Sequence, residues 1–181
     1  MQLLCSRRVL NGGTSKRDCS CALGKRLEGP LSSSIRILIA DDFRAWRLHN
    51  RLLLQARPEW QIIAEASDGS EAVQKAEELK PDLILLDISL PKLNGIEAAL
   101  RIRQLSPRSK IIFLSAQNSL DVVQAALSTG GLGYVRKTDT LRELLPAVDT
   151  VLQGKQFVSS SLRGSEFTDR LFRRSDVVFS E

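Results

Sequence analysis

The sequence predicts an α/β protein built on a doubly wound, five-stranded parallel sheet with five helices. Short apolar runs alternate along the chain with segments whose apolar residues recur at helical spacing, which is typical of βαβ units. The runs lack the polar alternation of a half-exposed strand, so we expect helices to cover both faces of the sheet. The expected strands are residues 35–40, 61–66, 82–87, 110–115 and 132–136.

A helical pattern follows each expected strand. In the first one, Ala45, Leu48, Leu52 and Leu53 recur at helical spacing and predict the buried face. Pro146 falls inside the last one and predicts a kink or a later start. Right-handed crossovers over both faces give the strand order 2-1-3-4-5 of flavodoxin-like folds. The expected helices lie near residues 43–56, 70–79, 95–105, 118–129 and 139–153.

The chain is expected to have three parts. Residues 1–34 form a basic extension with six Lys or Arg against two Asp or Glu, and we expect it to be disordered. Residues 35–155 form the folded domain, and residues 156–181 form a linker-like tail without a complete output domain. No apolar stretch approaches the roughly 20 residues of a membrane helix, and the start lacks a secretory signal. We therefore expect a cytoplasmic protein with no membrane partner.

Three carboxylates, a hydroxyl and an ammonium follow the expected strands. Asp41 and Asp42 follow the first strand, Asp87 ends the third, Ser115 ends the fourth and Lys137 follows the fifth. The carboxyl ends of parallel strands meet at one edge of the sheet, so we expect these groups to converge. Carboxylates packed together repel one another, and a hard cation such as Mg²⁺ removes that conflict. With the ammonium and the hydroxyl, this set suits a transferring phosphoryl group and a carboxylate nucleophile.

Five short motifs in this order resemble the receiver domain of bacterial two-component response regulators. The resemblance covers residues 35 to about 155, and each motif lies at a strand end or in the loop beside it. The motifs are IADD at 39–42, LLDISLP at 85–91, NG at 94–95, FLSA at 113–116 and GYVRK at 133–137.

The resemblance implies a phosphoacceptor and a metal site. Asp87 matches the aspartate that accepts a phosphoryl group from a histidine kinase or a histidine phosphotransfer protein. Asp42 matches the main Mg²⁺ ligand, and Asp41 matches an acidic neighbour that acts partly through water. The backbone carbonyl of Ser89 matches the third protein ligand.

The resemblance also implies a switch. Ser115 matches the hydroxyl that moves toward the phosphoryl group, and Tyr134 matches the aromatic residue that then turns inward. Lys137 matches the lysine that binds the phosphate, and its bond to Thr138 matches a peptide that is typically cis. Phosphorylation would change the face of the fourth helix, fifth strand and fifth helix. That face would bind a downstream protein or a second copy of the chain, giving a homodimer.

Several alternatives stay open at this stage. Residues 154–160 resemble the linker to a DNA-binding helix-turn-helix domain, but only about 20 residues follow, so DNA is not an expected partner of this chain alone. The chain could be a truncated DNA-binding regulator or a phosphorylation-independent scaffold. A classical enzyme is not expected, because aspartyl phosphohydrolases typically carry a second aspartate where this chain has Ser89. Glycine-rich nucleotide-binding motifs are absent.

Overall fold

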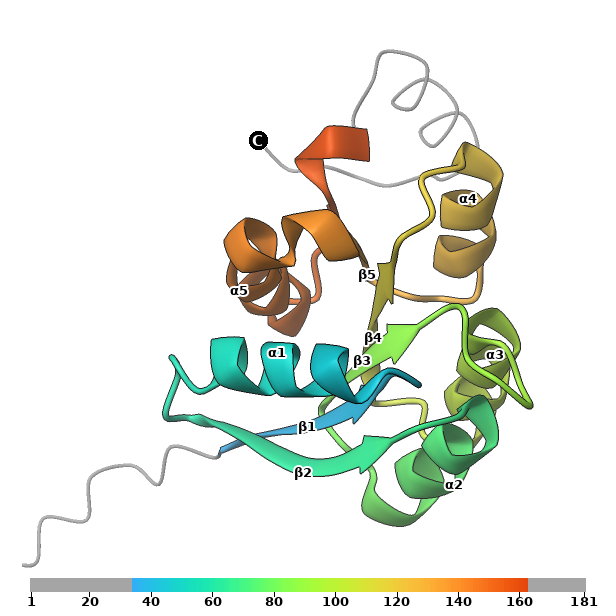
Figure 1. Cartoon of the computed structure of the whole chain (residues 1–181). Coiled ribbons are helices and arrows are strands. Elements are labelled where there is room, and N and C mark those ends of the chain that lie inside the picture. Colours follow the sequence, from blue (N-terminus) through green and yellow to red (C-terminus); the bar gives the residue numbers. More distant parts are fainter. Residues whose placement is uncertain (1–33, 163–181) are drawn as a thin grey trace, which may run out of the picture. The chain divides into compact units, whose positions relative to one another are not determined.

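A parallel sheet of six strands forms the centre of the described domain, with helices on both sides of it (Figure 1). The computed structural model describes residues 34–162, and the expectations for the basic extension and for the end of the tail fall outside these residues. The sheet order is β2-β1-β3-β4-β5-β6, with every neighbouring pair parallel. The strands are β1 Ile35–Ala40, β2 Trp60–Ala66, β3 Leu83–Asp87, β4 Lys110–Ser115, β5 Gly133–Arg136 and β6 Phe157–Val158.

The first five strands and their order confirm the predicted doubly wound fold, and β6 is an addition to it. This strand has only two residues, which is too short to show a strand pattern in the sequence. Backbone bonds hold it on the open edge of β5: the amide of Phe157 donates to the carbonyl of Leu132, and the amide of Ser159 donates to that of Tyr134, both at 2.9 Å. Val158 then packs into the core at 7% exposure.

Helices cover the sheet on both faces. Side chains of α1 and α5 share one apolar core with β1, β3 and β4, whereas α2, α3 and α4 close a second core on the opposite face. Helix α5 continues through Pro146 without a break, so the later start that proline allowed is not observed. The helices are α1 Arg44–Leu54, α2 Gly69–Leu79, α3 Gly95–Leu105, α4 Leu120–Ser128 and α5 Thr140–Leu152.

The buried face of α1 differs from the prediction at three of its four residues, and of these four Leu53 alone packs against the core as expected. Leu48 and Leu52 are 54% and 59% exposed, and Ala45 is exposed as well. The helix instead buries Asn50 and Leu54, which lie four residues apart on another side. Because Asn50 is polar, the buried side of α1 shows less apolar periodicity in the sequence than the exposed side that carries Leu48 and Leu52. No hydrogen-bond partner for the Asn50 amide is found among the described residues.

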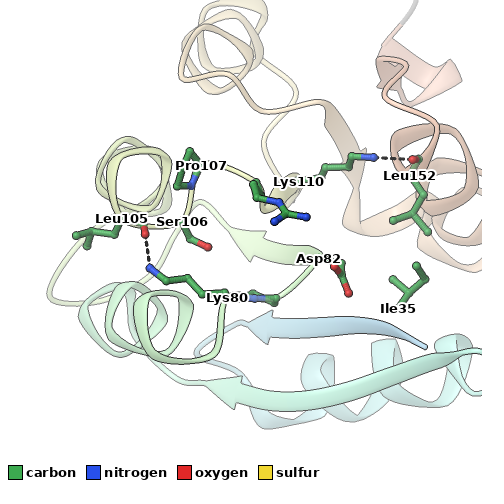
Figure 2. A pocket seen from close by; sticks show the side chains of 10 residues that line it. Ile35, Lys80, Asp82, Leu105, Ser106, Pro107, Lys110 and Leu152 are labelled. Carbon is green, nitrogen blue, oxygen red and sulfur yellow. Dashed lines mark hydrogen bonds between the residues drawn. The ribbon is translucent and has the colours of Figure 1, made fainter. Parts of the chain in front are cut away.

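A cleft of about 680 Å³ lies at the edge of the sheet where the strands begin (Figure 2). The ammonium groups of Lys80 and Lys110 lie along it and donate to the carbonyls of Leu105 and Leu152. These carbonyls belong to the last residues of α3 and α5, where a helix leaves acceptors unpaired and favours a positive charge. The lysines thus stabilise two helix ends, and the polar residues expected to act chemically lie at the other edge.

Candidate functional site

Three carboxylates meet where β1 and β3 end. The two strands are neighbours, and the last paired residues, Ala40 and Leu86, directly precede Asp41 and Asp87. Asp41 and Asp87 are buried, at 1% and 3% exposure, whereas Asp42 is exposed. One carboxylate oxygen from each of the three lies within 4.8 Å of the others. The acidic residues expected to converge therefore do so.

Lys137 supplies the positive charge of this cluster. It directly follows β5, and its Nζ lies 2.8 Å from Oδ2 of Asp41 and 2.8 Å from Oδ2 of Asp87. Burial opposes the charge on this ammonium, but its bonds to the two carboxylates outweigh burial and raise the pKa of Lys137. Burial raises the pKa of Asp41, and Lys137 offsets this only in part. The peptide bond between Lys137 and Thr138 is trans, not cis as the resemblance implies, which is the favoured form before a residue other than proline.

The donor set fits a hard divalent cation. Oδ2 of Asp41 is buried and lies 2.8 Å from the Lys137 ammonium, and no other described residue donates to it. The carboxylates of Asp42 and Asp87 offer further oxygen ligands within reach of the same point. Mg²⁺ prefers such ligands and keeps several waters, which suits a cluster with one exposed member. Ser89 lies exposed in the loop after β3, and the role of its carbonyl stays a prediction.

Ser115 and Tyr134 lie beside the acidic cluster and share a neighbour. Both side chains are fully buried. Oγ of Ser115 accepts a hydrogen bond of 3.1 Å from the amide of Gln117, and the Tyr134 hydroxyl donates to the carbonyl of Gln117 at 3.0 Å. Burial raises the pKa of Tyr134. The aromatic ring thus already points inward, and one loop residue connects it to the serine.

The Asn94-Gly95 motif shapes the loop between β3 and α3. Oδ1 of Asn94 accepts from the amide of Glu97 at 2.9 Å and caps the helix. The amide of Gly95 donates to the carbonyl of Ile88 at 2.9 Å. A Cβ at this glycine would lie 2.0 Å from the carbonyl oxygen of Asp87. The motif therefore allows α3 to begin directly against the backbone of the buried aspartate.

Two aromatic residues of α1 reach the site, although the sequence patterns did not predict this. The ring of Trp46 lies 5.5 Å from Nζ of Lys137, and His49 packs edge-on against it at 5.2 Å. Nε2 of His49 lies 3.2 Å from Oγ1 of Thr140, which donates to the carbonyl of Lys137 at 2.9 Å. His49 and Trp46 are three residues apart and therefore lie on one helix face. Their position in the helix that directly follows the two aspartates is the sequence feature that could have predicted their place beside the site.

The family comparison decides the identity of this site. The model of the response regulator receiver domain matches residues 37–149, more than half of the chain. The chain belongs to the response regulator receiver domain family. This confirms the resemblance of the five motifs. The receiver domain is a phosphoryl-accepting module that generally depends on Mg²⁺, interacts with histidine kinases and is generally not a classical enzyme.

Curated relatives are transcriptional regulators. A putative transcriptional regulator of Pseudomonas aeruginosa is 40% identical over 129 residues, which are 71% of this chain and 62% of that protein. The nitrate/nitrite response regulator protein NarL of Escherichia coli is 34% identical over 126 residues, 70% of this chain and 58% of NarL. This chain thus spans less than two thirds of these relatives.

Solved structures show the same fold. A two-component response regulator of the LuxR family from Aurantimonas matches with a TM-score of 0.72 and 31% identity, over 77% of this chain and 99% of that one. The response regulator domain of Thermotoga maritima CheB matches with a TM-score of 0.59 and 31% identity, over 66% and 94%. Among residues 34–162, no helix has the length and apolar character needed to cross a membrane.

Proposed function

We propose that this chain is a phosphorylation switch in which Asp87 accepts a phosphoryl group from a histidine kinase or a histidine phosphotransfer protein. The observation that carries the proposal is the position of Lys137, whose ammonium contacts both Asp87 and Asp41 at 2.8 Å. A lysine bound to two buried carboxylates balances charge before transfer and lies within reach of the oxygens of a group placed on Asp87.

The proposed step is a transfer between two nucleophiles. A carboxylate oxygen of Asp87 attacks the phosphorus atom, and the new O–P bond forms as the N–P bond of the donor's phosphohistidine breaks. The imidazole nitrogen keeps the electron pair of that bond, and the product is an aspartyl phosphate. Bound Mg²⁺ would neutralise charge on the phosphoryl oxygens during this step. Asp41, Asp42 and Asp87, with the carbonyl of Ser89, would hold it.

The other side chains have separate roles in this proposal. Lys137 leaves its ion pair with Asp87 and binds a phosphoryl oxygen, while its contact with Asp41 holds it in place. Ser115, whose Oγ accepts from Gln117, turns toward the phosphoryl group and donates to it. The loop containing Gln117 then shifts, and the Tyr134 hydroxyl bonded to that loop shifts with it. A chemical change at Asp87 thereby reaches β5.

We infer that the surface formed by α4, β5 and α5 is the output face, which binds a downstream protein or a second copy of the chain. Leu141 is 71% exposed at the start of α5, and Arg142 beside it is exposed too. Tyr134 and Leu127 lie buried beneath this face, where a rearrangement would alter its shape. We expect phosphorylation to change the mass of the species in solution, measured by light scattering, if the partner is a second copy.

The experiment uses phosphoramidate, a small donor with the same N–P bond, together with Mg²⁺ and intact-mass analysis. We expect the wild-type chain to gain one phosphoryl group and Asp87→Asn to gain none. Asp121→Asn is the matched control, because Asp121 is exposed on α4 and is not a member of the acidic cluster. Labelling of Asp87→Asn, or equal loss of labelling in both variants, would contradict the assignment of Asp87.

Mg²⁺ titration of the unphosphorylated chain distinguishes the remaining alternatives. Binding of one Mg²⁺ that Asp42→Asn weakens would support the proposed ligand set. Mg²⁺ binding without any labelling, from phosphoramidate or from a phosphorylated phosphotransfer protein, would instead favour a phosphorylation-independent scaffold. Neither labelling nor Mg²⁺ binding would overturn the proposed site.

A further inference from the structure

Arg47 joins α1 to the backbone of the acidic loop. Its Nη1 donates to the carbonyl of Asp41 at 2.8 Å and approaches that of Asp42 at 3.3 Å. Its Nε donates to Oε2 of Glu65 at 3.1 Å, and its side chain is only 16% exposed. One guanidinium therefore connects three elements: the loop after β1, the first turns of α1, and the end of β2.

Glu65 fixes the orientation of that guanidinium. Its second oxygen, Oε1, accepts from Nε of Arg51 at 2.9 Å, so the carboxylate is bound by two arginines one helical turn apart. Burial opposes the charge on Glu65, but the bonds from Arg51 and Arg47 outweigh burial and lower its pKa. The carboxylate thus stays ionised under ordinary conditions and holds Arg47 by its Nε side.

The charge of Glu65 also matters for the metal site. Arg47 brings a positive charge to the loop that carries Asp41 and Asp42, and an unpaired cation there would compete with Mg²⁺ for their carboxylates. Glu65 neutralises this charge and keeps the guanidinium on the carbonyl side of the loop. The pair therefore orders the loop without adding net positive charge beside the ligands.

We propose that Arg47 is a positioning residue for the Mg²⁺ site and that Glu65 is its anchor. By holding the carbonyls of Asp41 and Asp42, Arg47 sets the backbone of the loop and thereby the direction of the Asp42 carboxylate, which is exposed to solvent. Removing a residue that contacts the metal ligands, but not the metal itself, typically lowers metal affinity 10- to 100-fold. This inference rests on the proposed function.

The test compares Arg47→Met with Arg44→Met by calorimetric titration with Mg²⁺ alone, well below the unfolding temperature. Arg44 is the matched control, because it is an exposed arginine of the same helix. We expect Arg47→Met to weaken Mg²⁺ binding by about 10-fold or more and Arg44→Met to leave it within about twofold. At saturating Mg²⁺, phosphorylation of Arg47→Met by phosphoramidate should return close to the wild-type rate, since the nucleophile and Lys137 are intact.

Glu65→Gln provides a second, nearly isosteric route to the same contact. It frees Arg47 to move toward the carboxylates, so we expect weaker Mg²⁺ binding, and we expect the double variant Arg47→Met/Glu65→Gln to be no weaker than Arg47→Met alone. Arg47→Lys should bind Mg²⁺ more tightly than Arg47→Met but more weakly than wild type. The lysine ammonium keeps the charge, but it lacks the planar set of donors with which arginine contacts one carboxylate and two carbonyls.

The outcomes separate this inference from the proposed function. If wild type binds Mg²⁺ and both Arg47→Met and Glu65→Gln bind it equally well, the positioning role is wrong and the proposed function stands. The same holds if Arg47→Met lowers the unfolding temperature but leaves Mg²⁺ affinity and the Mg²⁺ dependence of phosphorylation unchanged. If wild type itself binds no Mg²⁺, the proposed function fails first. Should Arg47→Met not fold, Arg47→Lys and Glu65→Gln decide the question by the same titration.

Discussion

Replacing Gly95 with alanine tests whether α3 must begin directly against the backbone of Asp87. A Cβ at residue 95 would lie 2.0 Å from the carbonyl oxygen of Asp87 and 2.8 Å from Cα of Ile88. Both atoms belong to the main chain, so no side-chain rotation relieves the contact. The carbonyl and the helix must separate by about 1 Å to reach even 3.0 Å, and the proposed phosphoacceptor moves with that strand end.

The expected loss of stability follows from these contacts. Overpacking a close-packed interior costs about 1–3 kcal/mol. Separation also weakens the hydrogen bond from the Gly95 amide to Ile88, which is worth about 1 kcal/mol. The better helix propensity of alanine offsets at most about 1 kcal/mol. We therefore expect the free energy of unfolding to fall by about 1–3 kcal/mol, which lowers the midpoint by roughly 4–12 °C in a domain of this size.

The decisive measurement is phosphorylation of Gly95→Ala by phosphoramidate at a temperature where urea titration shows it to be folded. A shift of about 1 Å in a reacting group can slow a reaction about 100-fold, and we expect a loss of that order. Gly154→Ala is the control: its φ of +81° disfavours alanine, but nothing lies within 4 Å of the added carbon. It should lose about 1 kcal/mol and phosphorylate normally. A Gly95→Ala protein with wild-type stability and wild-type phosphorylation would refute the reasoning.

Three further substitutions test individual interactions. The stability difference between wild type and Glu65→Gln should become smaller in acid. Because the pKa of Glu65 is lowered by folding, its ionised carboxylate stabilises the fold above pH 4.5, and this contribution is lost as the pH falls through the folded-state pKa. Urea titrations of both proteins between pH 7 and pH 3 would show this, and a difference that stays constant would contradict it. Tyr134→Phe removes the bond to Gln117 and should lower the free energy of unfolding by about 1 kcal/mol at neutral pH, with an unchanged result arguing that water replaces the hydroxyl. Lys137→Met leaves two buried carboxylates without their cation, so we expect a loss of about 3–5 kcal/mol that added Mg²⁺ largely restores; a loss that Mg²⁺ does not change would argue against a metal at this cluster.

The first five strands and their order were predictable because a strand buried on both faces is a continuous apolar run in the sequence. The runs around Leu38 and Leu85 have no polar alternation, and each is followed by a helical pattern, so the topology follows from crossover handedness. The sixth strand has no such run, since backbone bonds at an open sheet edge hold Phe157 in place without a side-chain period. The wrong face of α1 has the same origin: periodicity reports where apolar residues gather, not which neighbour they meet.

The candidate site was predictable to the extent that its residues stand at strand ends. Parallel strands place Asp41, Asp87 and Lys137 at one edge whatever the details of packing, and the structure joins them at 2.8 Å. The residues that surround them come from elsewhere. Trp46 and Arg47 reach the site from a helix, through the angle at which α1 crosses the sheet, and no spacing along the chain encodes that angle.

Strand β5 connects the site to the last described part of the chain. At its end, Lys137 holds the buried carboxylates, and within it Tyr134 is bonded to the loop beyond Ser115 through the carbonyl of Gln117. On its outer edge the carbonyl of Tyr134 accepts from the amide of Ser159 at 2.9 Å. Oγ of Ser159 also accepts a hydrogen bond of 3.1 Å from the backbone amide of Arg136. A displacement of β5 must therefore break these bonds or carry the segment after β6 with it. The backbone itself thus connects a change at the carboxylates to the end of the described chain at residue 162.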